Sequence, residues 1–366
     1  MALRLLISLV VCAWWSAGAR AGDLYKADGP AAQVTVRDAE WHDAARDRDV
    51  PVRIYVPAGE GKHPLVVFSH GLGASRERYG YFGHALAEAG YVVIAPTHRG
   101  SDTEALRRWS KENGLSGKNE DGEGWMQDAI SEPDNLINRP KDISFVIDKA
   151  TADPALAPLV DADRIGVAGH SFGAYTAMAI GGMSVTPPGK DAKAAILRDP
   201  RVKAALPMSP QGAGVMGVTD QSWDTFAIPV LFLTGTKDYG SGGRAASWRR
   251  QPFDHVKGVD AYLFTIDGAT HMTFGGPGAN PSNDNSERST LRQRIAARVG
   301  ERIREKMAEK SGGVDPDVQE HVLMIESYST AFFDAYLQGN ESAKAWLVRY
   351  GGAKHEDCAA EFKPAK

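Results

Sequence analysis

The sequence is poor in cysteine: its 366 residues include 2, Cys12 and Cys358. Cys12 lies in a short apolar run, residues 5–15, that is followed by Ala19-Arg20-Ala21. This pattern predicts a signal peptide, residues 1–21, that is removed during export to the periplasm or out of the cell. Because Cys358 then remains as the lone thiol, a disulfide within the mature chain is excluded.

Long hydrophobic runs and blocks of one charge are also missing. The apolar run of residues 5–15 is shorter than the ~20 residues that span a bilayer, so we expect no stable membrane span after cleavage. The 42 Lys and Arg residues against 46 Asp and Glu residues give a formal net charge of -4 at pH 7. Since no basic face is indicated, we expect binding neither to nucleic acid nor to an anionic membrane surface.

Motifs for metals and nucleotides are equally absent. The sequence has no His-Glu-x-x-His motif and no paired-cysteine zinc pattern. The segments Gly114–Lys118 and Gly189–Lys190 lack both the spacing of a phosphate-binding P-loop and the Ser or Thr that follows its Lys. The sequence therefore predicts no metal and no cofactor.

What the sequence does contain is an alternation of short β-rich runs and longer helical patterns. Leu65–Phe68 and Val230–Leu233 are continuously apolar, which is typical of parallel strands covered on both faces by helices. We expect an α/β fold with a mostly parallel twisted sheet, an antiparallel edge and helices on both faces, in a single domain of residues 22–366. The expected strands are 34–37, 52–56, 65–69, 91–95, 164–168, 204–208, 229–234 and 261–266, and the expected helices are 78–89, 139–150, 172–181 and 318–338.

Two polar insertions, residues 101–140 and 275–313, interrupt the alternation. Loops of such length in a compact domain often serve as lids over a functional site. The alternative for each is a solvated surface insertion without a role.

The segment Gly169-His-Ser-Phe-Gly173 lies between an expected strand and an expected helix. Such a turn must be very sharp, so the two glycines let strand and helix approach while Ser171 is held in a strained conformation with its hydroxyl outward. Ser171 is therefore the candidate nucleophile.

A serine hydroxyl needs a base, and the base needs an orienting acid. Asp238 comes just past the end of the strand 229–234, and His271 follows the next strand. The chain order Ser171, Asp238, His271 is that of α/β-hydrolases. Competing candidates are expected to be surface or packing residues, namely Asp267, His255 and His321.

Backbone N–H groups near the serine are expected to bind the oxyanion of the reaction. Phe172 opens the helix after Ser171, and Gly71 and Gly73 allow Leu72 N–H to point at the same oxygen. The acyl or alcohol pocket is expected to include Gln211, Trp223 and Phe274.

Five motifs together resemble one branch of a known superfamily. They are Phe68-Ser-His-Gly-Leu-Gly73, Thr97-His-Arg-Gly-Ser101, Gly169-His-Ser-Phe-Gly173, Leu233-Thr-Gly-Thr-Lys-Asp238 and Gly268-Ala-Thr-His271. The chain is similar to the α/β-hydrolases that include platelet-activating factor acetylhydrolases and bacterial predicted dienelactone hydrolases. That resemblance implies ester hydrolysis with Ser171, Asp238 and His271 as triad and Leu72 and Phe172 as oxyanion donors. Dienelactone hydrolases proper use a cysteine where this chain has Ser171.

The sequence thus predicts an exported serine hydrolase that cleaves a small carboxylic ester, of short-chain or acetyl type, with a role in lipid degradation. Its activity should fall below about pH 6 to 7, because the base must be neutral. The alternatives are an amidase, peptidase or lactone hydrolase on the same scaffold, and a binding protein that keeps the fold without turnover.

Overall fold

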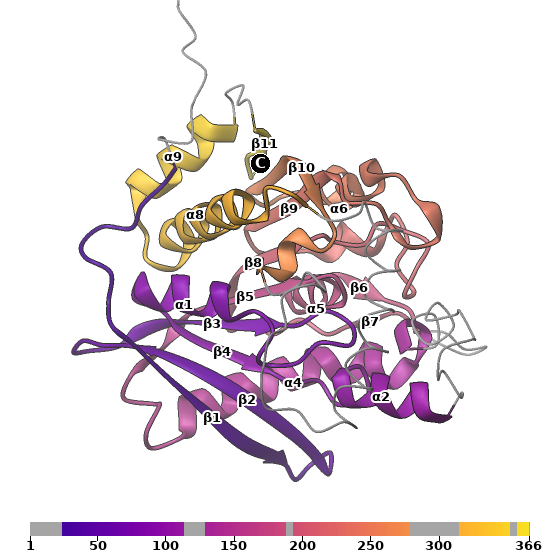
Figure 1. Ribbon diagram of the computed structural model, residues 1–366, viewed down its shortest axis with the longest axis horizontal. Coiled ribbons are helices and arrows are strands. Elements are labelled where there is room, and N and C mark those ends of the chain that lie inside the picture. The colour runs from indigo at the N-terminus through magenta and orange to yellow at the C-terminus, as the bar shows by residue number, and fades with distance from the viewer. Residues whose placement is uncertain (1–23, 113–128, 188–192, 278–314, 352–356, 366) are drawn as a thin grey trace, which may run out of the picture.

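The computed structural model describes residues 24–112, 129–187, 193–277, 315–351 and 357–365. The expected signal peptide, residues 1–21, and most of the second insertion lie outside these residues. The centre of the molecule is a nine-stranded sheet in the order β1-β2-β4-β3-β5-β8-β9-β10-β11 (Figure 1). The strands are β1 (Val34–Asp43), β2 (Arg48–Pro57), β3 (His63–Ser69), β4 (Val92–Pro96), β5 (Val160–His170), β8 (Val202–Met208), β9 (Val230–Lys237), β10 (Ala261–Thr270) and β11 (Cys358–Lys363), with a separate pair β6 (Ser184–Val185) and β7 (Ala195–Ile196).

The strands from β4 to β10 in the sheet order pair in parallel, which confirms the expected class of fold. The apolar stretches of β3 and β9 are buried, as their sequences predicted. Parallel pairing brings the carboxyl ends of these strands to one edge of the sheet, where α/β folds place their sites. Ser171, Asp238 and His271 each come directly after the end of one of these strands.

Antiparallel strands close both edges of the sheet. The hairpin of β1 and β2 pairs with β4 on one side, as expected but with longer strands. On the other side β11 pairs with β10. The sequence Cys358-Ala-Ala-Glu-Phe-Lys363 gave no sign of this strand, because it is short and has no strict alternation of apolar and polar residues.

Helices cover both faces of the sheet. The buried residues of α4 and α5 belong to one apolar cluster, and those of α1, α8 and α9 belong to the other. Among the described residues, none of the helices combines the length and the apolarity needed to cross a bilayer. The helices are α1 (Gly80–Glu88), α2 (Thr103–Glu112), α4 (Pro133–Ala152), α5 (Phe172–Gly181), α6 (Gln251–His255), α8 (Val318–Leu337) and α9 (Glu341–Gly351).

The first insertion is partly helical, which corrects the expectation of a loop over residues 101–140. It contains α2 and the start of α4, and Pro133 is well suited to that start because the first helical N–H has no partner. Pro140 lies inside α4 and cannot donate a hydrogen bond to the Leu136 carbonyl. The hydroxyl of Tyr175 on α5 donates to that carbonyl instead (3.3 Å). A hydrogen bond between α4 and α5 thus replaces the helical hydrogen bond that Pro140 cannot make.

Candidate active site

Ser171 lies on the turn between β5 and α5. Its backbone has φ 55° and ψ -116°, a conformation that non-glycine residues rarely adopt. Glycines make the turn possible, because a Cβ on Gly169 would collide with the Gly173 carbonyl and a Cβ on Gly173 would collide with the Ser69 carbonyl. The turn holds Ser171, partly exposed, at the carboxyl edge of the sheet.

His271 follows β10 and reaches both other members of the predicted triad. Its Nε2 lies 2.9 Å from Ser171 Oγ, and its Nδ1 lies 3.0 Å from Asp238 Oδ1. With the proton on Nδ1, Nε2 is free to accept the serine proton. Burial and the positive charge of Arg249 lower the pKa of His271 below its ordinary value, so the imidazole is neutral at pH 7.

Asp238 is fully buried just beyond β9. Besides His271, its carboxylate accepts a hydrogen bond from Thr234 Oγ1 (3.0 Å) and forms an ion pair with Arg249 Nε (2.8 Å). Burial alone would raise the pKa of Asp238, but the charge of Arg249 and the hydrogen bond from His271 outweigh it and hold the pKa well below its ordinary value. The carboxylate is therefore ionised and able to stabilise a positive charge on His271.

The structure leaves both predicted oxyanion donors available. Phe172 is the first residue of α5, so its N–H has no acceptor in its own helix. Within the described residues, neither Leu72 N–H nor Phe172 N–H donates a hydrogen bond to the protein. Two free N–H groups of this kind suit the negative charge of a tetrahedral intermediate.

A chain of hydrogen bonds joins the loop of Leu72 to His271. Gly71 N–H donates to the Tyr79 hydroxyl (3.0 Å), the hydroxyl donates to His170 Nδ1 (2.9 Å), and His170 Nε2–H donates to the His271 carbonyl (2.9 Å). Burial lowers the pKa of His170 well below its ordinary value, which keeps this ring neutral as the chain requires. The loop and the imidazole are thus positioned relative to each other.

Comparisons with known proteins find relatives for part of the sequence and a similar fold. The family model described as platelet-activating factor acetylhydrolase, isoform II, matches residues 50–130. The platelet-activating factor acetylhydrolases of Canis lupus familiaris and Bos taurus are 32% identical over 139 residues and 27% identical over 140 residues. A solved ferulic acid esterase from Streptomyces cinnamoneus has a TM-score of 0.53 and 20% identity, covering 86% of this chain and 93% of that chain. The fold is that of the α/β-hydrolases.

The α/β-hydrolase fold expected from the sequence is thereby confirmed, and so is the resemblance to platelet-activating factor acetylhydrolases over part of the chain. The matches to the dog and bovine relatives cover 32% and 31% of this chain and 31% of each relative. The chain therefore matches about a third of the length of these curated relatives.

Sequence analysis missed two residues at the centre of this candidate site. Ser209 follows β8 with a positive φ of 54°, and its Oγ lies 2.6 Å from His271 Nδ1. Arg249, in a short 3-10 helix (η4, Ala246–Arg250), has its NH2 3.0 Å from the same nitrogen. Ser209 could have been found from its place just after a strand. Arg249 belongs to no sequence motif that would indicate a residue of the site.

The three predicted pocket residues lie in different surroundings. Phe274 stacks on His170, with ring centroids 6.1 Å apart. Gln211 follows Ser209 by two residues and is buried, and its side-chain oxygen has no partner within the described part of the chain. Trp223 is fully buried in the core, and its ring stacks on His255 (5.4 Å) rather than on His271.

The competing candidates have other partners. Asp267 accepts a hydrogen bond from Thr236 (2.8 Å), and His321 pairs with Asp315 (2.7 Å). His255 stacks on Trp223 and donates to the Gln251 carbonyl (2.8 Å).

A second row of serine, histidine and aspartate lies inside the molecule. Ser69 Oγ is 2.9 Å from His98 Nε2, and His98 Nδ1 is 3.0 Å from Asp142 Oδ2. All three side chains are fully buried. Arg139 also donates to Ser69 Oγ (3.2 Å), so this hydroxyl has two partners and no access to solvent.

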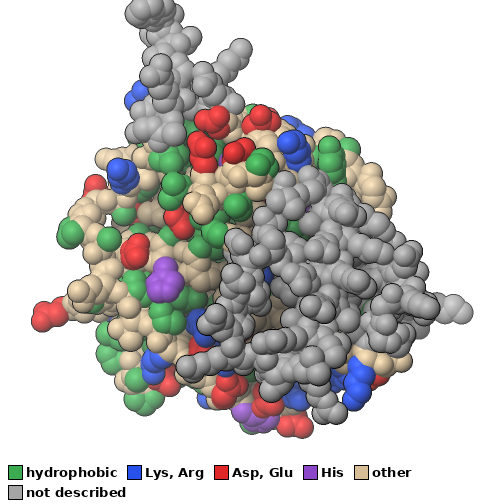
Figure 2. All heavy atoms as spheres, in the orientation of Figure 1, with side chains coloured by type: hydrophobic (Ala, Val, Ile, Leu, Met, Phe, Trp, Pro, Cys, Tyr) green, Lys and Arg blue, Asp and Glu red, His purple; other side chains and the backbone are tan. Residues whose placement is uncertain are grey.

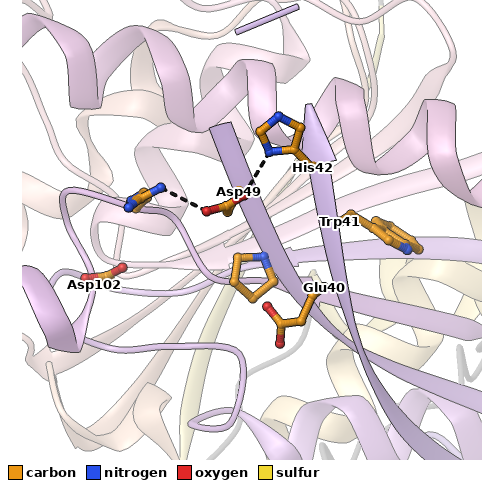
Figure 3. Close-up of a pocket in the computed structure, with 7 residues that line it drawn as sticks. Glu40, Trp41, His42, Asp49 and Asp102 are labelled. Carbon is orange, nitrogen blue, oxygen red and sulfur yellow. Dashed lines mark hydrogen bonds and ion pairs between the residues drawn. The ribbon is translucent and has the colours of Figure 1, made fainter. Parts of the chain in front are cut away.

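The depression drawn in Figure 3, about 390 Å³ in volume, is lined by none of the triad residues. Its carboxylates already have partners, since Glu40 pairs with Arg76 (2.7 Å) and Asp49 pairs with both His42 and Arg99. Figure 2 shows acidic, basic and apolar side chains interspersed over the described part of one face of the molecule. The depression is therefore a weaker candidate for the functional site than the hydrogen-bonded Ser171, His271 and Asp238.

Proposed function

We propose that this chain is a serine hydrolase that cleaves carboxylic esters through an acyl-serine intermediate. The observation that carries the proposal is the hydrogen-bonded row Ser171–His271–Asp238 on a strained turn at the carboxyl edge of the sheet. The names of the similar proteins, an acetylhydrolase and a ferulic acid esterase, support the same class of reaction.

Acylation uses the row as follows. His271 Nε2 takes the proton of Ser171 Oγ while Oγ forms a bond to the ester carbonyl carbon. The negative charge moves to the carbonyl oxygen, where the N–H groups of Leu72 and Phe172 stabilise it. Asp238 stabilises the imidazolium, and Nε2 returns its proton to the leaving alcohol as the ester bond breaks.

Deacylation repeats these steps with water. His271 takes a proton from water, the hydroxide oxygen bonds to the acyl carbon, and the proton finally returns to Ser171 as the carboxylic acid leaves. No step needs a metal or a cofactor.

The substrate class we favour is short-chain or acetyl-type esters, with lipid esters as the natural source. We further propose that residues 1–21 direct export and that residues 22–366 form one domain. The name of the curated relatives, an acetylhydrolase, supports the preference for a short acyl group.

The proposal is tested with p-nitrophenyl esters of increasing acyl length. The native protein should hydrolyse the acetyl ester fastest, and Ser171→Ala should lose the activity. Ser184→Ala serves as a control, because Ser184 lies in the separate two-stranded sheet and bonds to the Ser222 carbonyl (3.4 Å). Equal rates for Ser171→Ala and the native protein would refute the mechanism.

Three rivals remain, and related assays distinguish them from the proposal. An amidase or peptidase would prefer peptide anilides to esters, and a lactone hydrolase would prefer cyclic esters. A binding protein would neither turn over an ester nor react with a fluorophosphonate.

A further inference from the structure

Arg249 is a buried cation placed against both the acid and the base of the proposed triad. Its side chain is 3% exposed, and its Nε lies 2.8 Å from Asp238 Oδ1. Burying a charge costs free energy unless partners offset the lost hydration. A guanidinium in this place therefore requires a compensating set of acceptors.

That set lies on the loops that follow two neighbouring strands. Arg249 NH1 donates to the carbonyl groups of Ser209 (3.0 Å) and Pro210 (3.1 Å), and NH2 donates to the carbonyl of Tyr239 (3.0 Å). Nε also lies 3.2 Å from the Asp238 carbonyl. The guanidinium thus ties the loop after β8 to the loop that carries Asp238.

The same group faces the base. Arg249 NH2 lies 3.0 Å from His271 Nδ1, and a guanidinium can only donate. The other groups that face this imidazole are the carboxylate of Asp238, the hydroxyls of Ser171 and Ser209, and the ring of His170, whose centroid is 4.8 Å away. His170 is neutral, so the charges around His271 are one negative and one positive.

We propose that Arg249 is a positioning residue of the site: it fixes the carboxylate of Asp238 and the two loops, and its charge opposes the second proton on His271. This inference rests on the proposed function, because it assigns His271 as the base. Together with burial, the charge of Arg249 lowers the pKa of His271. The base therefore stays neutral, and the enzyme active, to lower pH than Asp238 alone would allow.

Three variants separate the charge from the hydrogen bonds. Arg249→Gln removes the charge and keeps an amide donor, so the acid limb of kcat/KM should move up by about one pH unit. Arg249→Lys keeps the charge but loses the several N–H donors of the guanidinium. The acid limb of kcat/KM should therefore stay near its native pH while kcat falls. Arg250→Gln is the control, because Arg250 pairs with Asp254 and Glu361 in a half-exposed position, and it should leave both unchanged.

NMR titration of the His271 ring supplies a readout that needs no ester hydrolysis. The pKa of His271 should lie below about 6.5 in the native protein and rise in Arg249→Gln. If Arg249→Gln shows no cooperative unfolding transition, the variant is not folded, and the test is then the pKa of His271 in the native protein. A native pKa at or above about 6.5 contradicts the inference. An unchanged pKa in folded Arg249→Gln also overturns it. A shifted pKa without ester hydrolysis would instead sink the proposed function alone.

Discussion

The two rows of serine, histidine and aspartate have the same connectivity and the same distances. In each, the serine oxygen lies 2.9 Å from the histidine Nε2 and the histidine Nδ1 lies 3.0 Å from the carboxylate. They differ in surroundings: Ser171 is partly exposed on a strained turn beside free N–H groups, whereas Ser69 is fully buried and bonded to Arg139. Hydrogen-bond geometry therefore does not by itself make a nucleophile.

The buried row supports the exposed one. The backbone N–H of His98 donates to His70 Nε2 (2.9 Å), and the Arg139 guanidinium donates to the His70 carbonyl. Both contacts hold the residue that precedes the Gly71–Gly73 turn. The row at Ser69 thus supports the loop of Leu72, whereas the row at Ser171 is the one that we propose to meet the substrate.

Replacing the two serines should give the largest contrast. Ser171→Ala should lower kcat by about 10⁴-fold or more, because it removes the proposed nucleophile, and should leave the free energy of unfolding nearly unchanged. Ser69→Ala should lower kcat by less than about tenfold and cost about 1 to 3 kcal/mol of stability, because it leaves buried partners unsatisfied. Ester kinetics and urea unfolding measure the two effects. Comparable losses of kcat would break the distinction.

The buried carboxylate should matter chiefly for stability. Asp142 accepts from Arg46 NH1 (2.8 Å), Arg48 Nε (2.9 Å) and His98. Asp142→Asn should therefore cost about 3 kcal/mol, at the lower end for a buried ion pair because both arginines are partly exposed. Asp161→Asn removes the surface pair with Arg164 and should cost less than about 1 kcal/mol. Urea unfolding measures the free energy of unfolding of both variants. An equal loss in Asp142→Asn and Asp161→Asn would contradict the difference expected between a buried and a surface ion pair.

Tyr79 connects the two regions, so Tyr79→Phe should have an intermediate effect. It removes the acceptor for Gly71 N–H and the donor to His170, and kcat should fall about tenfold with KM little changed. Tyr175→Phe is a matched control, because that hydroxyl bonds to the Leu136 carbonyl in α4. A fall in kcat of the same size in Tyr175→Phe would indicate a general effect on the fold.

The two histidines should also differ in titration. Burial and the nearby charge of Arg139 lower the pKa of His98 to about 3. The pKa of His271 is also below its ordinary value, and as the proposed base His271 should set the acid limb of kcat/KM. Since an unfolded histidine binds a proton near pH 6.5, the unfolded state binds more protons than the folded one between about pH 6.5 and 3. The free energy of unfolding should therefore fall as the pH falls through this window. NMR titration would contradict this account if His98 were protonated by pH 6.

The parts of the molecule that sequence patterns revealed are those fixed by local chemistry. The turn Gly169–Gly173 has a distinctive spacing, and the apolar runs of β3 and β9 have a distinctive composition, so both could be predicted. Asp238 and His271 could be placed because each follows a strand in the expected order.

The contacts that no pattern revealed depend on long-range packing. Arg249 and the pair His98–Asp142 are brought to their partners by elements far apart in the chain, and nothing in their neighbouring residues indicates it. The strand β11 needs the exposed edge of β10 to form. Trp223, whose aromatic side chain suggested a pocket, is fully buried in the core, and its place in the pocket stays a prediction.

The acyl group itself tests the central claim most directly. The reaction of the native protein with excess p-nitrophenyl acetate is quenched in acid during turnover. The protein is then digested, and the masses of its peptides are measured by mass spectrometry. The account predicts one acetyl group on the peptide of Ser171 and none on the peptide of Ser69. Acetylation at another residue during turnover, with Ser171 unmodified, would contradict it.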